Sequence, residues 1–197
     1  FVQKGTPLKV DVIVTDHHEC SAARPPALAV LNPKMPEQPF PFRDLAGVGV
    51  ALYLLVALRT YLRECGFWTV QNQPNLLDAL DLVALGTLAD MVPLQQENRI
   101  FVKHGMKVLA DTARPGWAAL MEKAGISSSV SRARPLIFRL IPRINAPGRL
   151  GHPLDALDVL LCQDLEEARR IAGVVEDRNV ERKLIEERLY QEALAMA

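Results

Sequence analysis

The sequence is poor in cysteine, shows no excess of one charge and contains no long apolar run. Its three cysteines, Cys20, Cys65 and Cys162, stand far apart without a CxxC pair. This spacing argues against a disulfide framework and a zinc knuckle, and it favours a reducing compartment such as the cytoplasm. Lysine plus arginine and aspartate plus glutamate both total 23, so any affinity for nucleic acid must come from local clustering of charge.

The longest apolar run, residues 46–58, is shorter than the roughly 20 residues that span a bilayer, so we expect no membrane segment. Apolar residues make up 49% of the 197 residues, which is enough for one sizeable core. The chain opens on Phe1 without an initiator methionine or a signal-peptide pattern. We therefore expect a fragment of a longer protein, called the parent protein below.

Two β-branched runs predict the strands of a parallel sheet, Leu8–Thr15 and Ala27–Leu31. The proline-rich segment 32–42 predicts a loop. Helical spacing of apolar residues then dominates the chain. The fold class that follows is α/β, with a partial parallel sheet flanked by helices and a long connecting helix at the end.

Capping residues and helix breakers set the expected helix bounds. Asp44 is the expected N-cap of a helix that stops at Gly66, and the glycines at 47 and 49 are expected to allow close helix packing. Further helices are expected at 76–90 after the cap Asn75, at 95–110, and from Pro115. The charged segment 164–197 contains no proline and predicts one long solvated helix.

The triplet Asp16-His17-His18 stands where the first strand would deliver its last residues to the edge of the sheet, a common ligand position. Because neighbours along a strand point to opposite sides, one imidazole could bind a metal while the other faces a phosphate. The carboxylate of Asp16 could fix a histidine tautomer. The alternative is a polar loop whose side chains merely close the strand.

Asp90 ends an apolar helix just before the break at Pro93. The C-terminal end of a helix repels negative charge, so a cation should compensate. A bound metal would do so, because carboxylate oxygen and imidazole nitrogen together suit Mn²⁺ or a related divalent ion. The alternative is an exposed carboxylate or one paired with an arginine such as Arg99.

Arg143 and Arg149 flank the turn-like residues Asn145-Ala146-Pro147-Gly148, within a stretch, 123–154, that has no carboxylate. We expect a rigid loop that holds two guanidinium groups with no local acid to neutralise them, an arrangement suited to phosphate. The alternative is two surface arginines that bond carbonyl groups or distant carboxylates.

Five segments, VIVTDHH, NPK, DLAGVGVALYLL, LDLVALGTLADMVPL and PRINAPGRL, appear in this order along nearly the whole chain. Their order and spacing resemble the DHH phosphoesterase family. The resemblance implies an α/β catalytic core that hydrolyses phosphodiesters at a two-metal site of Mn²⁺ or Mg²⁺. By motif, His17 and Asp90 would be metal ligands. His18 would contact the scissile phosphate or aid proton transfer.

The same resemblance implies that Asp16 orients the histidine pair, and that Arg143, Asn145 and Arg149 hold the DNA backbone. The most similar members are bacterial exonucleases that digest single-stranded DNA from the 5′ end to 5′-mononucleotides in DNA repair and recombination. Residues 1–163 would then be a partial catalytic core, and 164–197 would link it to a second domain. Single-stranded DNA is the expected partner, with a helicase and a single-strand-binding protein beside it, and the parent protein is expected to be a monomer.

Family members carry an upstream Asp-x-Asp-Gly strand end, a further Asp-Gly turn and a downstream glycine- and histidine-rich loop, and none of them occurs in this sequence. His17 and Asp90 alone cannot fill two metal spheres. We therefore expect the 197-residue piece to be inactive by itself. Degradation of single-stranded DNA by the purified piece with Mn²⁺ would contradict this.

Three other interpretations stay open at this point. Some relatives in the family cleave pyrophosphate, short oligonucleotides or cyclic dinucleotides instead of a polymer. The chain could also be a non-catalytic nucleic-acid-binding module with a degenerate site, or a structural domain. A length series of substrates tests the small-substrate interpretation, and the presence of upstream carboxylates tests the binding module. The effect of replacing His17 on the rate tests the structural domain.

Overall fold

The computed structural model describes residues 10–20, 24–37, 40–127 and 132–196. The chain divides into two compact units, Phe1–Val108 and Leu109–Ala197, and each is described by itself. The predicted division of the parent protein after residue 163 stays a prediction. No helix within the ranges above is long and apolar enough to cross a membrane.

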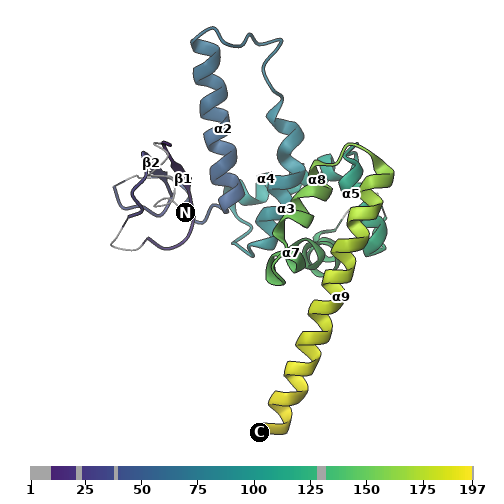
Figure 1. The fold of residues 1–197 in the computed structure, drawn as a ribbon. Coiled ribbons are helices and arrows are strands. Elements are labelled where there is room, and N and C mark those ends of the chain that lie inside the picture. The colour runs from purple at the N-terminus through teal and green to yellow at the C-terminus, as the bar shows by residue number, and fades with distance from the viewer. Residues whose placement is uncertain (1–9, 21–23, 38–39, 128–131, 197) are drawn as a thin grey trace. The chain divides into compact units, whose positions relative to one another are not determined.

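The first unit contains two short strands, β1 (Ile13–Thr15) and β2 (Ala29–Leu31), which pair in parallel with Ile13 opposite Ala29. The predicted strand pair and its parallel direction are confirmed. The strands are shorter than predicted because only three residues of each find a partner in the other, and residues 8 and 9 lie outside the described ranges. The sheet lies against helix α2 (Gly47–Glu64), as Figure 1 shows.

Helix α2 begins two residues later than its predicted cap would place it. The N-cap is Ala46, whose backbone is extended (φ −66°, ψ 154°), so the assignment of Asp44 as N-cap is wrong. The physical reason is burial: Leu45 and Ala46 both enter the core, and the chain stays extended until they are in place. The predicted stop is confirmed, because the helix ends at Glu64 and Gly66 adopts a left-handed conformation with φ 75°.

Two further helical segments complete the first unit. A 3₁₀ turn, Leu76–Ala79, leads into α3 (Leu80–Ala89), and the Asn75 side chain accepts a hydrogen bond from the Leu77 amide (3.3 Å). Helix α4 (Gln96–Ala110) crosses the start of α3 closely. A Cβ at Gly105 would lie 2.0 Å from the carbonyl oxygen of Leu80, so only glycine permits this crossing.

The second unit is entirely helical in the part of the chain that is described. Its elements are α5 (Pro115–Ala124), α6 (Ala133–Pro135), a π-helical turn (Leu136–Leu140), α7 (Ile141–Arg149), α8 (Pro153–Leu161) and α9 (Leu165–Met196). The predicted helix start at Pro115 and the long final helix are confirmed. The Asp164 side chain accepts a hydrogen bond from the Glu167 amide (2.8 Å) and so caps α9.

Helix α9 packs against α5, α7 and α8. Its small residues Ala168, Ala172 and Val175 are buried, and Trp117 of α5 is buried in the same core. The C-terminal part of α9, drawn in yellow in Figure 1, is exposed and carries ion pairs between residues one turn apart. Such pairs contribute only about 0.3–0.5 kcal/mol each, so packing of the N-terminal half fixes this helix.

The predicted rigid loop between Arg143 and Arg149 is wrong, because these residues belong to α7. Pro142 stands in the first turn of α7, directly after the π-helical turn. Pro147 lies inside the helix, yet it is buried together with Ile141 and Ala146. Burial of this apolar face outweighs the turn preference of the Asn-Ala-Pro-Gly sequence.

Candidate active site

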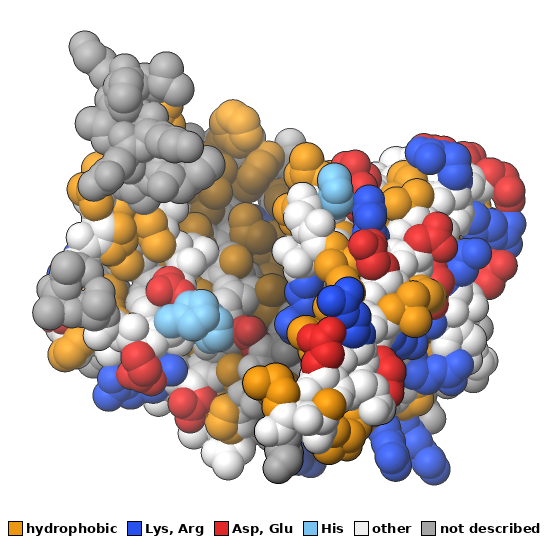
Figure 2. Space-filling model, turned by 60° about the horizontal axis from the view of Figure 1, so that its bottom comes forward, with side chains coloured by type: hydrophobic (Ala, Val, Ile, Leu, Met, Phe, Trp, Pro, Cys, Tyr) orange, Lys and Arg blue, Asp and Glu red, His pale blue; other side chains and the backbone are white. Residues whose placement is uncertain are grey.

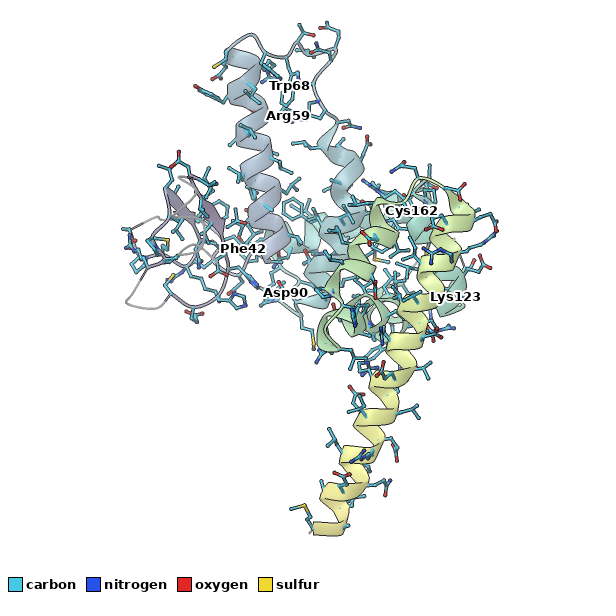
Figure 3. All side chains as sticks on the ribbon, in the orientation of Figure 1. Phe42, Arg59, Trp68, Asp90, Lys123 and Cys162 are labelled. Atoms are coloured by element: carbon cyan, nitrogen blue, oxygen red, sulfur yellow. The ribbon has the colours of Figure 1, made fainter. Side chains whose placement is uncertain are left out.

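The first feature of the site is a contact between the end of β1 and the end of α3. His17 follows the strand, and Asp90 is the C-terminal cap of α3, labelled in Figure 3. The Nε2 atom of His17 lies 3.1 Å from Oδ2 of Asp90, and their side chains are 17% and 38% exposed. Two residues far apart in the sequence therefore present an imidazole nitrogen and a carboxylate oxygen to one point.

Asp16 organises the histidine pair through a single oxygen. Its Oδ1 accepts hydrogen bonds from the backbone amides of His17 (2.8 Å) and His18 (3.2 Å), and it lies 2.6 Å from Nδ1 of His18. Partial burial acts to raise the pKa of Asp16, but these hydrogen bonds outweigh it, and the pKa lies below its usual value. Asp16 is thus a carboxylate that holds His18 by Nδ1, and the Nε2 atom of His18 stays available to a ligand.

The two imidazoles do not point to opposite sides of the sheet, so that prediction is wrong. Their ring centroids are 4.5 Å apart with an interplanar angle of 46°. The reason is that β1 ends at Thr15 and the hydrogen bonds to Asp16 form an Asx turn, so strand alternation no longer applies. Figure 2 shows histidine surface, in pale blue, open to solvent with acidic side chains beside it.

Asn32 supports the histidine segment from the end of β2. Its Nδ2 donates to the carbonyl oxygen of His18 (2.9 Å), and its Oδ1 accepts from the Lys34 amide (2.9 Å). The Asn32 residue is buried, and the Asp16 amide donates to the carbonyl of Leu31 beside it (2.9 Å). The Asn-Pro-Lys segment therefore fixes the backbone of the histidine pair. A polar residue directly after a predicted strand was the signal for this role.

Gly47 makes room for His17. A Cβ at Gly47 would lie 3.1 Å from Cδ2 of His17, closer than about nine in ten real Cβ contacts. Close helix packing was predicted for Gly47 and Gly49, but Gly47 faces His17, and Gly49 faces Leu45 of the segment that precedes α2. The start of α2 thus forms one wall of the histidine position, a contact that local sequence does not reveal.

Asn98 of α4 links the two chain segments that flank the site. Its side chain is fully buried; Nδ2 donates to the carbonyl oxygens of Asp44 (2.7 Å) and Pro93 (3.1 Å). Its Oδ1 accepts from the amide of Ala46 (3.3 Å). The segment that enters α2 and the segment that follows Asp90 are therefore held by one amide group.

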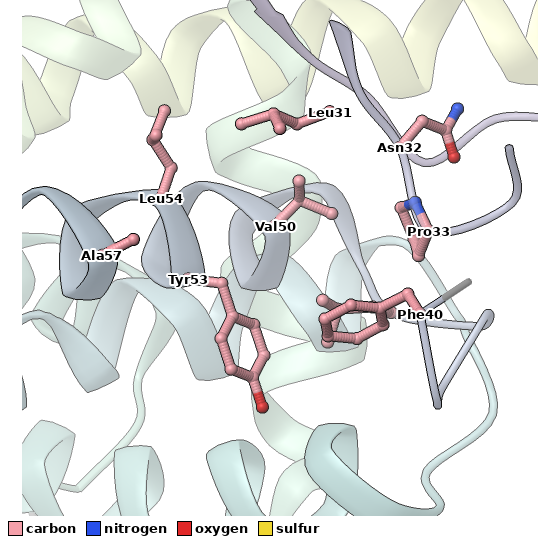
Figure 4. A pocket seen from close by; sticks show the side chains of 9 residues that line it. Leu31, Asn32, Pro33, Phe40, Val50, Tyr53, Leu54 and Ala57 are labelled. Carbon is pink, nitrogen blue, oxygen red and sulfur yellow. The ribbon is translucent and has the colours of Figure 1, made fainter. Parts of the chain in front are cut away.

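Two cavities meet at Asn32. A polar one of about 500 Å³ includes Asp16, Glu19 and Arg24 in its lining. An apolar one of about 380 Å³ lies between β2 and α2, and Figure 4 shows Leu31, Phe40, Val50 and Tyr53 around it. Charged groups line only the first of these two cavities, which includes the carboxylate of Asp16.

The donor set at His17 and Asp90 fits a divalent ion. Two ligands at right angles around an ion at ~2.1 Å lie about 3.0 Å apart, close to the observed 3.1 Å. One nitrogen and one carboxylate oxygen suit Mn²⁺ or Mg²⁺. No group of three or more potential ligands occurs within the described ranges, so these two residues would hold an ion only together with further ligands.

The predicted phosphate-binding residues lie in the second unit, and the structure separates their roles. Arg143 is only 13% exposed and pairs with Glu176 of α9, through Nε and through Nη2 at 3.1 Å. No acid of the stretch 123–154 neutralises Arg143, but Glu176, 33 residues further along the chain, does, which is the alternative of a distant carboxylate. Asn145 and Arg149, in contrast, line a cavity of about 210 Å³.

Comparison with known proteins agrees with this geometry. A family model described as "DHH family, N-terminal domain" matches residues 2–87. The single-stranded-DNA-specific exonuclease RecJ of Escherichia coli is 44% identical over 198 residues, which cover 99% of this chain and 34% of that protein. This chain belongs to the DHH family.

Other relatives of this DHH chain carry the same name. RecJ of Bacillus subtilis is 36% identical over 189 residues, 96% of this chain and 22% of that protein. The crystal structure of exonuclease RecJ bound to manganese matches with a TM-score of 0.83 at 35% identity, covering 100% of this chain and 47% of that one. RecJ of Thermus thermophilus in complex with Mn²⁺ matches equally well, with 28% of its chain covered.

The DHH chain thus spans about a third of the length of the E. coli RecJ protein. Its helix-rich fold with a small parallel sheet is that of the matched part of RecJ.

Proposed function

We propose that the full-length protein containing this chain is a metal-dependent exonuclease. It hydrolyses single-stranded DNA from the 5′ end and releases 5′-mononucleotides during DNA repair and recombination. The observation that carries the proposal is the 3.1 Å approach of His17 Nε2 and Asp90 Oδ2. The similarity to RecJ exonucleases supports the choice of substrate.

His17 and Asp90 would hold one divalent ion, Mn²⁺ or Mg²⁺, together with ligands from outside the described ranges. Such an ion, when bound, lowers the pKa of a water molecule and neutralises charge on the phosphoryl oxygens. Gly47 keeps the imidazole of His17 in place for this task. Asn98 holds the segment that follows Asp90 and the start of α2 together through its hydrogen bonds to both.

His18 would act on the substrate directly. Its side chain is 78% exposed, and Asp16 holds Nδ1 so that Nε2 can contact a phosphate oxygen or transfer a proton. Asp16 is therefore a positioning group for His18, supported by two backbone amides. Asn32 fixes the carbonyl of His18 from the opposite side of the same segment.

DNA would be held through its backbone, because the charges in question recognise phosphate and not bases. Asn145 and Arg149 would contact the strand. Arg143 would serve the same surface by fixing α7 on α9 through Glu176. A helicase and a single-strand-binding protein are the protein partners that this activity calls for, and the three free thiols support a reducing compartment such as the cytoplasm.

The test is the His17→Ala variant of the full-length protein on 5′-labelled single-stranded DNA with Mn²⁺. We expect a loss of hydrolysis of at least a hundredfold with unchanged thermal stability, since His17 is not a core residue. His104→Ala, at an exposed position of α4, is the matched control. An unchanged rate for His17→Ala would reject the catalytic role.

A length series of substrates tests the polymer specificity separately. Activity confined to dinucleotides or pyrophosphate would reject the exonuclease assignment while keeping phosphoester hydrolysis. The expected result is faster release of nucleotides from long strands, since backbone contacts beyond the scissile phosphate then add to binding.

A further inference from the structure

Helices α7 and α9 line a cationic cavity that shares no residue with the His17 site. The cavity measures about 210 Å³. Its lining consists of Ile141, Pro142, Asn145, Arg149, Arg182 and Glu186. Two guanidinium groups and one carboxylate thus share the cavity, which leaves an excess of positive charge. The two helices pack directly on each other.

Arg182 is held in this cavity with a donor to spare. Its side chain is only 16% exposed, and its Nε atom is buried without a hydrogen-bond partner in the described part of the chain. Its Nη2 donates to Oδ1 of Asn179 (3.3 Å), and its Nη1 pairs with Glu186. A buried unpaired donor of a charged group costs free energy, so the hydrogen bonding of the Arg182 guanidinium is incomplete at the cavity that it lines.

Asn179, one turn before Arg182, also has a buried donor without a hydrogen-bond partner in the described ranges. It is fully buried, and its Nδ2 has no hydrogen-bond partner among the residues described. By holding Nη2, its Oδ1 orients the guanidinium plane of Arg182. Two residues of α9 that are one turn apart therefore keep unused donors, and Arg182 is the one that lines the cavity.

Arg149 supplies the second cation. It is exposed at the last turn of α7, and no hydrogen bond or ion pair engages it within the described ranges. Arg143 differs in this respect, because Glu176 and the carbonyl of Arg139 occupy its Nε, Nη1 and Nη2 atoms. Of the two arginines on α7, Arg149 is thus the one with capacity for a ligand, and it shares the cavity with Arg182 of α9.

We propose that Arg149, Asn145 and Arg182 form a phosphate subsite that binds one backbone phosphodiester of the single-stranded substrate. Arg143 is a positioning residue that fixes α7 on α9. The inference rests on the proposed function and adds Arg182 of the long helix to the DNA-binding surface. Glu186, half-exposed and paired with Arg182, competes with the phosphate for the same guanidinium.

The experiment measures binding of a labelled single-stranded oligonucleotide to the full-length protein over a range of salt concentrations without divalent metal. Arg182→Ala should weaken binding about tenfold, and the slope of log affinity against log salt should fall by about 0.7, one phosphate contact. Arg149→Ala should do the same. Arg188→Ala, on the same helix and paired with Glu192 in the same way, should change neither.

Glu186→Gln keeps the inference falsifiable if Arg182→Ala is poorly folded. Removing the competing carboxylate should strengthen binding about threefold, a gain that misfolding cannot produce. Unchanged affinity and salt slope in Glu186→Gln and Arg149→Ala would overturn the subsite. If these variants are unchanged while the wild-type protein still degrades single-stranded DNA, the subsite fails and the proposed function stands. No binding or hydrolysis by the wild-type protein would remove the function itself.

Discussion

Gly47→Ala is the sharpest perturbation that the site offers, because it adds one methyl group beside a candidate metal ligand. The new Cβ would lie 3.1 Å from Cδ2 of His17, whereas carbon atoms prefer about 3.5–4.0 Å. The imidazole must therefore move by about half an ångström. Its Nε2 now lies 3.1 Å from Asp90 Oδ2, and active-site geometry tolerates only about 0.5 Å.

We expect Gly47→Ala to lower the rate of hydrolysis about tenfold or more, since a misplacement of 1 Å costs on the order of a hundredfold. Stability should not fall, because Gly47 is the first residue of α2 and alanine is favoured over glycine in helices by up to ~1 kcal/mol. Activity and stability thus change independently, or in opposite directions.

The assay combines hydrolysis of single-stranded DNA by the full-length protein with thermal unfolding of the same sample. Gly173→Ala on α9 is the matched control, because a Cβ there meets no atom within 4 Å, and it should raise stability without changing the rate. A Gly47→Ala enzyme as fast as the wild type would refute the reasoning. So would a loss of rate explained by an equal loss of folded protein.

Four further outcomes follow from the contacts described. Gly105→Ala should destabilise the first unit by about 3 kcal/mol in urea unfolding, because its Cβ would meet the carbonyl of Leu80 at 2.0 Å. Asn98→Ala should cost about 3 kcal/mol in the same measurement, since three backbone groups lose their partner. The pKa of Asp16 is lowered, so its stabilising effect is present above the usual carboxyl pKa and is lost as pH falls through the lowered one. Asp16→Asn should therefore flatten the acid side of a stability–pH curve, and an unchanged curve would contradict the role of Asp16. The isolated 197-residue chain should not degrade single-stranded DNA with Mn²⁺ in a gel assay.

The fold was predictable wherever a local signal acts alone. Pro115 begins a helix, Gly66 follows the end of one, and Asn75 caps another, because each acts through its own backbone or side chain. Asp44 failed as a cap because burial of its two successors decided the start of α2. In α7, burial of the apolar face likewise outweighed the turn preference of the Asn-Ala-Pro-Gly sequence. Local signals therefore predict bounds only where the core does not compete for the same residues.

The approach of His17 and Asp90 was predictable from the resemblance to the DHH family, whose motifs imply that both residues hold a metal. The supporting contacts were not, because Gly47, Asn98 and Glu176 act on partners that only the folded chain brings near. Glycine and asparagine in a helix carry no local mark of such roles. The candidate ligands could thus be inferred from the sequence, whereas the residues that support them could not.

The hydrogen bonds of Asn98 make the backbone amide of Ala46 sensitive to the loop that follows Asp90. Since one side chain serves both the Ala46 amide and the Pro93 carbonyl, the loop after Asp90 cannot loosen without releasing that amide. Cation capture at the aspartate should tighten the loop and slow deuterium uptake at position 46, although this amide touches neither proposed ligand. Hydrogen exchange at the Ala46 amide would therefore measure metal binding even in a variant that hydrolyses DNA too slowly to assay.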